Sequence, residues 1–260
     1  MKSTKDIELF LFDLDGTINM GDTPLEGAID TLNRLTAHGK KVCFVTNNSS
    51  KSKYDYHKKI RNLGYDAKIE QIITSGMATA QFLSRHRPYK SIYVLGTDEL
   101  KREMSDYGIE IKDENQDADV VVLGFDTSLT YDKLFHACIL LEKGKDYIAT
   151  HPDFVCPSEY GNMPDTGAIM ALIEKTNGRT PSVVIGKPNA PMADFVFDHC
   201  HIEPEKVAMV GDRLYTDILF GINNKMTSIL VLTGETTVEM VHKSHIKPDI
   251  VLDSVNDIEV

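Results

Sequence analysis

The sequence lacks the segments that direct a protein to or through a membrane. It contains no run of about 18 apolar residues, the minimum for a membrane span. The first six residues are not followed by the apolar stretch of a signal peptide. The four cysteines, at positions 43, 138, 156 and 200, form no C-x-x-C pair. We therefore expect a cytoplasmic protein with reduced thiols and no membrane partner.

Positive charge is also scarce. The 28 lysines and arginines are outnumbered by 39 aspartates and glutamates, which gives a net charge of -11. A nucleic-acid-binding protein usually carries a basic stripe, and the densest basic stretch here, residues 51–59, has the pattern of a solvated helix face. We expect no nucleic-acid partner, so an anionic ligand would have to be held by local positive charge. Neither G-x-G-x-x-G nor G-x4-G-K-[ST] occurs, which excludes a dinucleotide fingerprint and a P-loop.

Strand and helix patterns alternate along all 260 residues. A hydrophobic fraction of 42% supports a real core. The alternation predicts an α/β fold with a parallel sheet and right-handed crossovers. Strands are expected at residues 7–12, 42–46, 69–74, 92–95, 120–123, 147–150, 183–185, 207–210, 228–232 and 250–251. Helices are expected at residues 24–38, 51–63, 75–87, 99–107, 131–143, 166–176, 191–199, 215–221 and 237–242, with an irregular stretch at 151–164.

One stretch, Leu9 to Thr17, combines an apolar strand with two carboxylates. The strand ends on Asp13, and Asp15 follows two positions later, before a Gly-Thr turn. Open α/β sheets bind their ligands at the carboxyl ends of strands. Two carboxylates so close repel each other, and Mg²⁺ is the simplest remedy because it prefers oxygen ligands. One carboxylate could attack phosphorus while the other transfers a proton; the alternative is an edge loop with two solvated aspartates.

Three further predicted strands end on polar or charged groups. Thr46 and Asn47 end the second strand and could form an anion cradle, or simply cap the next helix. Lys187 follows another strand and offers a positive charge for a phosphate oxygen, unless it is a surface lysine in a turn. Asp212 could complete a metal site and Asp217 could orient Lys187, or the pair could be a turn and a helix cap. Together these groups are the parts that phosphoryl transfer requires.

The order of these motifs resembles the haloacid dehalogenase superfamily. Gly186-Lys187-Pro188 and Met209-Val-Gly-Asp-Arg213 resemble its NagD-like branch, which includes p-nitrophenyl phosphatases. The resemblance implies a Rossmann-like core at residues 1–79 and 182–260. It also implies an inserted α/β cap domain at residues 80–181. In the cap, Thr150-His151-Pro152-Asp153 departs from the Thr-Asn that the branch usually has.

The resemblance also implies a Mg²⁺-dependent phosphatase that works through an aspartyl phosphate. It implies that the substrate is a small phosphorylated metabolite, such as a sugar phosphate or a nucleotide, and a homodimer would fit it. In the implied mechanism Asp13 is the nucleophile, and Asp15 is the acid–base catalyst. Mg²⁺ is bound by Asp13, Asp212 and the backbone of Asp15. The phosphoryl group is bound by Thr46, Asn47 and Lys187, and Asp217 supports Lys187.

Two other functions are compatible with parts of this pattern. A dehalogenase of the same fold needs neither Asp15 nor magnesium, so the presence of Asp15 and Asp212 argues against it. A non-catalytic protein that binds phosphorylated metabolites would not require the nucleophile Asp13, which is intact here.

Overall fold

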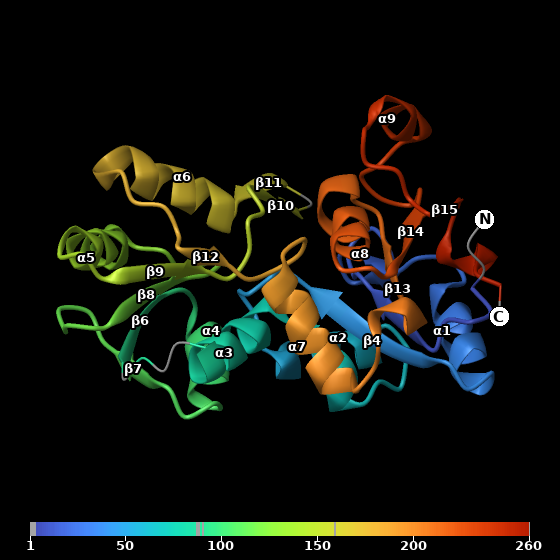
Figure 1. Ribbon diagram of the computed structural model, residues 1–260, viewed down its shortest axis with the longest axis horizontal. Helices are drawn as coiled ribbons and strands as arrows, with labels where there is room; N and C mark the ends of the chain where they lie inside the picture. The colour runs from blue at the N-terminus through green and yellow to red at the C-terminus, as the bar shows by residue number, and fades with distance from the viewer. Residues whose placement is uncertain (1–3, 87–88, 90, 159, 260) are drawn as a thin grey trace. The chain divides into compact units, whose positions relative to one another are not determined.

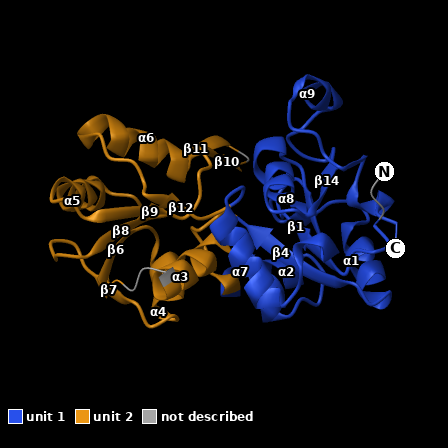
Figure 2. Cartoon of the chain, in the orientation of Figure 1, with its two compact units in different colours: residues 1–46, 54–73, 187–260 blue, residues 47–53, 74–186 orange. Residues whose placement is uncertain are grey.

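The computed structural model describes residues 4–86, 89, 91–158 and 160–259 (Figure 1). The chain forms two compact units (Figure 2). Unit 1 comprises residues 1–46, 54–73 and 187–260, and unit 2 comprises residues 47–53 and 74–186. The assignment of residues 1–79 and 182–260 as a core and 80–181 as a cap stays a prediction. Among the described residues, no helix has both the length and the apolar character needed to cross a bilayer.

Unit 1 is built on a six-stranded sheet in the order β15-β14-β13-β1-β4-β5. Its strands are β1 (Leu9–Phe12), β4 (Lys41–Thr46), β5 (Ile72–Thr74), β13 (Val207–Gly211), β14 (Thr227–Val231) and β15 (Ile250–Leu252). The central strand β1 is parallel to both of its neighbours, β13 and β4. All four of its residues are buried, as expected for a strand covered on both faces. The carboxyl ends of β1, β4 and β13 therefore meet at one edge of the sheet.

The helices of unit 1 cover both faces of this sheet. They are α1 (Ala28–Ala37), α2 (Lys53–Asn62), α7 (Ala190–Cys200), α8 (Leu219–Asn223) and α9 (Val238–Lys243), with short helical turns η1 (Ile69–Gln71), η2 (Pro204–Lys206), η3 (Leu214–Ile218) and η4 (Val255–Asp257). Phe10 and Phe12 point to one face and pack in a core cluster with Leu32 of α1 and Ile60 of α2. Gly221 of α8 lies beside Met209 on β13, whose side chain points to the opposite face.

The predicted helix at residues 24–38 begins later than expected. A short antiparallel pair, β2 (Asn19–Met20) and β3 (Thr23–Pro24), precedes α1. The helix cannot extend further back because Gly27 has φ 70°, a left-handed conformation outside the α-helical region. Two further boundaries also differ: residues 69–71 form the turn η1 rather than strand, and the predicted helix at 215–221 opens with the π-helical turn η3.

Unit 2 contains a five-stranded sheet in the order β12-β9-β8-β6-β7, and every adjacent pair is parallel. Its strands are β6 (Ser91–Leu95), β7 (Glu110–Lys112), β8 (Val120–Leu123), β9 (Asp146–Ala149) and β12 (Val183–Val184). Its helices are α3 (Ser75–His86), α4 (Asp98–Ser105), α5 (Tyr131–Glu142) and α6 (Thr166–Asn177). A separate apolar core forms between this sheet and α5 and α6. The predicted last residue of α3, Arg87, lies outside the described residues.

Unit 2 also contains strands that the sequence analysis missed. β7 was not expected, and the stretch predicted as irregular contains the antiparallel hairpin β10 (Val155–Ser158) and β11 (Gly161–Pro164). Two prolines and a glycine at φ 125° obscure the strand pattern there. The hairpin forms because its two segments are adjacent in the chain and satisfy each other's backbone groups. The Ser158 hydroxyl closes the turn by donating to the Gly161 carbonyl at 2.6 Å.

Candidate active site

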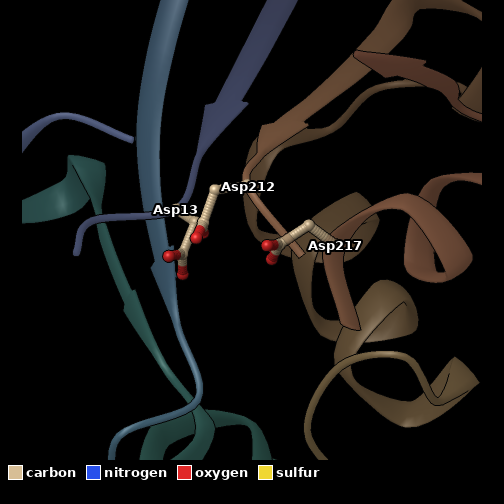
Figure 3. A group of neighbouring side chains, drawn as sticks. All are labelled: Asp13, Asp212 and Asp217. Carbon is tan, nitrogen blue, oxygen red and sulfur yellow. The ribbon is translucent and has the colours of Figure 1, made fainter. Parts of the chain in front are cut away.

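Three carboxylates gather at the carboxyl edge of the unit 1 sheet (Figure 3). Asp13 follows β1 and Asp212 follows β13, the neighbouring parallel strand. The Asp13 amide donates to the Val210 carbonyl at 2.9 Å, which extends the ladder by one residue. Each of Asp13, Asp212 and Asp217 contributes one carboxylate oxygen to a group whose members lie within 4.8 Å of one another. The structure therefore brings together residues that are about 200 positions apart in the sequence.

Lys187 is the cation that faces these carboxylates. Its side chain is 1% exposed. Its ammonium donates to Asp13 Oδ1 at 2.7 Å, to Asp217 Oδ1 at 2.7 Å and to the Val45 carbonyl at 2.9 Å. Burial alone would lower the pKa of Lys187, but the charges of Asp13 and Asp217 outweigh it and hold the pKa above its usual value. Lys187 is therefore a fixed positive charge in the site.

Asp217 has both of its oxygens engaged by protein groups. Oδ1 accepts from Lys187, and Oδ2 accepts from the Arg213 amide at 3.2 Å. Burial raises the pKa of Asp217 to about 6, although Lys187 acts against this shift. Gly211 makes room for the side chain, because a Cβ at that position would lie 2.3 Å from Asp217 Cβ. This arrangement suits the predicted supporting role of Asp217 better than a role as a metal ligand.

Asp212 differs from Asp217 because a protein group binds only one of its two carboxylate oxygens in the described structure. Oδ2 accepts from the Glu235 amide at 2.7 Å. Oδ1 is buried and has no hydrogen-bond partner within the described parts of the chain. Burial, followed by repulsion from Asp217 and Asp13, raises the pKa of Asp212 to about 7. A buried carboxylate oxygen without a partner, next to a second carboxylate, fits the all-oxygen ligand set of a hard divalent cation such as Mg²⁺.

The turn after β1 places Asp15 at the surface of the site. The Asp15 side chain is 55% exposed, and its Oδ1 accepts from Asn19 Nδ2 at 2.6 Å and from Lys59 Nζ at 3.3 Å. Gly16 has φ 87°, and a Cβ there would lie 2.6 Å from Asp212 Oδ2. The turn thus requires glycine for both its conformation and its approach to Asp212. Thr46 is buried at the end of β4, the strand next to β1.

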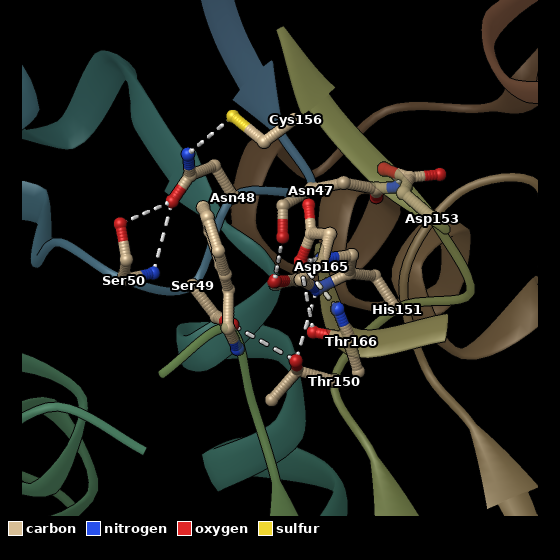
Figure 4. A network of polar contacts seen from close by, with 12 residues as sticks. Asn47, Asn48, Ser49, Ser50, Thr150, His151, Asp153, Cys156, Asp165 and Thr166 are labelled. Carbon is tan, nitrogen blue, oxygen red and sulfur yellow. Dashed lines mark hydrogen bonds and ion pairs between the residues drawn. The ribbon is translucent and has the colours of Figure 1, made fainter. Parts of the chain in front are cut away.

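Asn47 belongs to unit 2 and contacts other residues of that unit (Figure 4). Its Nδ2 donates to Asp153 Oδ2 at 3.0 Å, and its carbonyl accepts from the Ser75 hydroxyl. The side chain is buried. Its predicted contact with a phosphoryl oxygen stays a prediction, as do the roles of the other predicted site residues.

The sequence analysis did not foresee a chain of buried polar groups in unit 2. The Ser49 hydroxyl lies 2.9 Å from Thr150 Oγ1, which lies 3.0 Å from His151 Nδ1. His151 Nε2 lies 2.9 Å from Asp165 Oδ1. All four residues are buried, and Figure 4 shows the network. The sequence signal that could have indicated this network is His151, which stands where the family usually has Asn. A histidine that becomes buried needs polar partners, so polar neighbours could have been expected.

Three groups at one edge of a parallel sheet define a class of enzyme. They are the Asp13 carboxylate, which can act as a nucleophile, the charged Lys187, and Oδ1 of Asp212, which has no hydrogen-bond partner among the described residues and suits a metal ion. They are the groups that bind a phosphoryl group and transfer it to a carboxylate. Neither a nucleotide-cofactor site nor a nucleic-acid surface would need this arrangement.

Comparisons with known proteins agree with this class. A family model described as haloacid dehalogenase-like hydrolase matches residues 10–110, and one described as HAD-hydrolase-like matches residues 184–258. An acid sugar phosphatase from Staphylococcus aureus is 36% identical over 253 residues, which cover 97% of each chain. The chain therefore belongs to the haloacid dehalogenase-like hydrolase family, and it is a phosphatase.

Solved structures show the same relationship. A 4-nitrophenylphosphatase from Thermotoga maritima is 47% identical, with a TM-score of 0.92 and coverage of 97% of this chain and 96% of that one. A glycerol phosphate phosphatase from Mycobacterium tuberculosis, solved in complex with magnesium, is 26% identical, with a TM-score of 0.92. That alignment covers 100% of this chain and 78% of the other. The predicted α/β class and the resemblance to NagD-like phosphatases are confirmed.

Proposed function

We propose that this phosphatase hydrolyses small phosphate monoesters in a Mg²⁺-dependent reaction with a covalent intermediate on Asp13. The observation that carries the proposal is the pairing of Asp13 with Lys187 beside Oδ1 of Asp212, an oxygen that has no hydrogen-bond partner among the residues that the structure describes. The lysine fixes one oxygen of Asp13, and Oδ1 of Asp212 marks where a cation would be held.

The carboxylates of Asp13 and Asp212 and the main-chain carbonyl of Asp15 would hold Mg²⁺. When bound, Mg²⁺ would offset the negative charge of the carboxylates and polarise a phosphoryl oxygen. This set consists of oxygen donors only, as Mg²⁺ prefers. Asp217 stays outside the set because its oxygens are occupied by Lys187 and the Arg213 amide.

The remaining chemistry falls to side chains of the protein. Because Lys187 holds Oδ1 of Asp13, the other oxygen, Oδ2, is the one that attacks phosphorus and forms the aspartyl phosphate as the bond to the leaving alcohol oxygen breaks. Asp15 gives a proton to that alcohol and later takes one from the attacking water. Its exposed carboxylate is accessible for this role once it leaves Asn19 and Lys59.

Phosphoryl binding involves Lys187, Thr46 and Asn47. In the structure Lys187 uses its three donors on Asp13, Asp217 and Val45. A phosphoryl oxygen would therefore have to replace one of these acceptors, and the neutral Val45 carbonyl is the weakest of the three. The names of the relatives support sugar phosphates as a substrate class, and a panel of sugar phosphates, nucleoside monophosphates, phosphoglycolate and pyridoxal phosphate would test it.

The proposal predicts that Asp13→Asn abolishes turnover. We expect hydrolysis of p-nitrophenyl phosphate to fall by at least about 10³-fold, because the amide cannot act as a nucleophile. The wild type should lose activity in a chelator and regain it with Mg²⁺. Asp22→Asn is the matched control, since Asp22 is an exposed aspartate close by in the chain. A fully active Asp13→Asn enzyme with a native circular dichroism spectrum would contradict the proposed mechanism.

A further inference from the structure

A short segment after β14, residues 233–235, contacts two turns of the candidate active site. The Thr233 hydroxyl donates to the Gly16 carbonyl at 2.6 Å, and the Glu235 amide donates to Asp212 Oδ2 at 2.7 Å. Gly16 belongs to the turn that carries Asp15, and Asp212 follows β13. The segment therefore joins the turns that follow two adjacent strands, β1 and β13.

The middle residue of the segment packs directly on the Asp212 carboxylate. A Cβ on Gly234 would lie 2.1 Å from Asp212 Oδ2 and 2.5 Å from Cγ. No side chain fits at that distance, so the close approach requires glycine. Gly16 also packs closely on this carboxylate, because a Cβ there would lie 2.6 Å from the same oxygen. Two glycines thus approach the Asp212 carboxylate closely and restrict its rotation.

The segment is itself anchored by the Glu235 side chain. Its Oε2 lies 3.1 Å from Arg213 Nε and accepts from the Tyr215 hydroxyl at 3.0 Å. Arg213 directly follows Asp212 in the chain. Glu235 therefore ties the segment to the loop that carries Asp212.

We infer that residues 233–235 are positioning residues that make Asp212 a one-oxygen ligand of Mg²⁺. The segment occupies Oδ2 and leaves Oδ1, which is buried and without a hydrogen-bond partner in the described chain, for the cation. The segment also bonds to the turn at Gly16, next to Asp15. It therefore fixes the position of the Asp15 main-chain carbonyl relative to the Asp212 carboxylate. None of the three residues takes part in the chemistry. The inference rests on the proposed Mg²⁺ dependence.

The sharpest test compares two valine substitutions in adjacent parts of the loop. Thr233→Val removes the hydroxyl that donates to Gly16. Thr236→Val removes a buried hydroxyl that has no hydrogen-bond partner among the described residues, and it keeps the Thr236 amide that donates to the Asp212 carbonyl. Gly234→Ala adds a methyl group against the Asp212 carboxylate, and Thr233→Ser restores the donor. Mg²⁺ binding to each metal-free protein is measured by isothermal titration calorimetry, and kcat is measured as a function of Mg²⁺ concentration.

We expect the Kd for Mg²⁺ to rise about tenfold in Thr233→Val and by more in Gly234→Ala, as is typical when a group that orients a metal ligand is lost. Thr236→Val and Thr233→Ser should bind Mg²⁺ like the wild type. At saturating Mg²⁺ the kcat of Thr233→Val should return to the wild-type value, which a general loss of folding would not allow. If Gly234→Ala does not fold, the Thr233→Val and Thr233→Ser pair decides the question.

Equal Mg²⁺ affinity in Thr233→Val, Thr236→Val and the wild type would overturn the inference, and so would a loss of kcat that Mg²⁺ cannot restore. A wild-type protein that neither binds Mg²⁺ nor needs it for activity is a different outcome. It would overturn the proposed function, and the inference with it.

Discussion

Burial is the largest influence on the ionisation of Asp212 and Asp217; the charges of Asp217 and Asp13 add to it at Asp212, whereas the charge of Lys187 opposes it at Asp217. Their pKa values are raised to about 7 and about 6. When the pKa of a carboxyl is higher in the folded than in the unfolded protein, the folded state holds the proton more tightly. The resulting stability is present below the unfolded pKa and is lost as pH rises through the folded value. The metal-free protein should therefore be less stable at neutral pH than in mild acid.

Mg²⁺ binding should show the opposite pH dependence. A cation bound through Oδ1 of Asp212 must displace the proton from that carboxyl, so affinity should fall by about tenfold for each pH unit below about 7. Calorimetric titrations of the metal-free protein across this range, in buffers of different ionisation enthalpy, would measure both the affinity and the proton released. An affinity that stays constant through pH 7 with no proton release would contradict this account.

Lys187 should be important for stability as well as for activity. Lys187→Met leaves the partly buried carboxylate of Asp13 and the buried carboxylate of Asp217 without their cation. We expect the free energy of unfolding at neutral pH to fall by about 3–5 kcal/mol, with a smaller loss in acid, where Asp217 is protonated. Urea unfolding at both pH values measures this. Lys206→Met is the control, because its 3.0 Å ion pair with Glu8 is exposed and should contribute about 1 kcal/mol or less.

Helix α4 carries a buried acid, Glu103, that contacts two other segments of unit 2. Its Oε1 accepts from the Lys53 amide at the start of α2 at 2.9 Å, and its Oε2 accepts from the Thr74 hydroxyl at 2.7 Å. Burial raises the pKa of Glu103 to about 7, although both hydrogen bonds act against this shift. Glu103 therefore favours folding most in acid and loses that contribution as pH rises from about 4.5 to about 7.

Glu103→Gln should remove this pH dependence, because the amide does not ionise. We expect the stability of the variant relative to the wild type to increase as pH rises through this range. Thermal unfolding of both proteins at a series of pH values, with Glu99→Gln on the same helix as control, gives the difference. A relative stability that is constant, or that falls with pH, would show that Glu103 is ionised in the folded protein throughout.

Strands and helices were predicted most accurately where the local pattern of apolar and polar residues is clear. β8 was predicted residue for residue because its four apolar residues are bounded by Asp119 and Gly124, which both disfavour strands. The hairpin β10–β11 was missed because its residues are largely exposed and include prolines, so no alternation of apolar and polar residues identifies it. The late start of α1 depended on the left-handed Gly27, which helical periodicity does not report.

At the scale of the whole molecule, each unit has a large apolar core cluster among the residues that the structure describes. Leu140 of α5 is fully buried in the core of unit 2. Leu140→Ala should cost about 2–5 kcal/mol and should lower protection from hydrogen exchange in β8 and β9, while β1 and β13 stay protected. Exchange measured by mass spectrometry tests this, with the exposed Leu172→Ala as control. An equal loss of protection in both units would mean that they unfold together.

The sequence by itself determined the α/β class, the position of most strands, and the carboxylates that end β1 and β13. These features are encoded locally, because apolar runs and the turns after them follow from neighbouring residues. Only the tertiary structure decided that Lys187, 174 positions from Asp13, lies between Asp13 and Asp217. It also decided that residues 233–235 occupy one oxygen of Asp212, and that His151 joins a buried chain of polar groups. Such contacts depend on how strands and loops distant in sequence pack together, which local patterns do not encode.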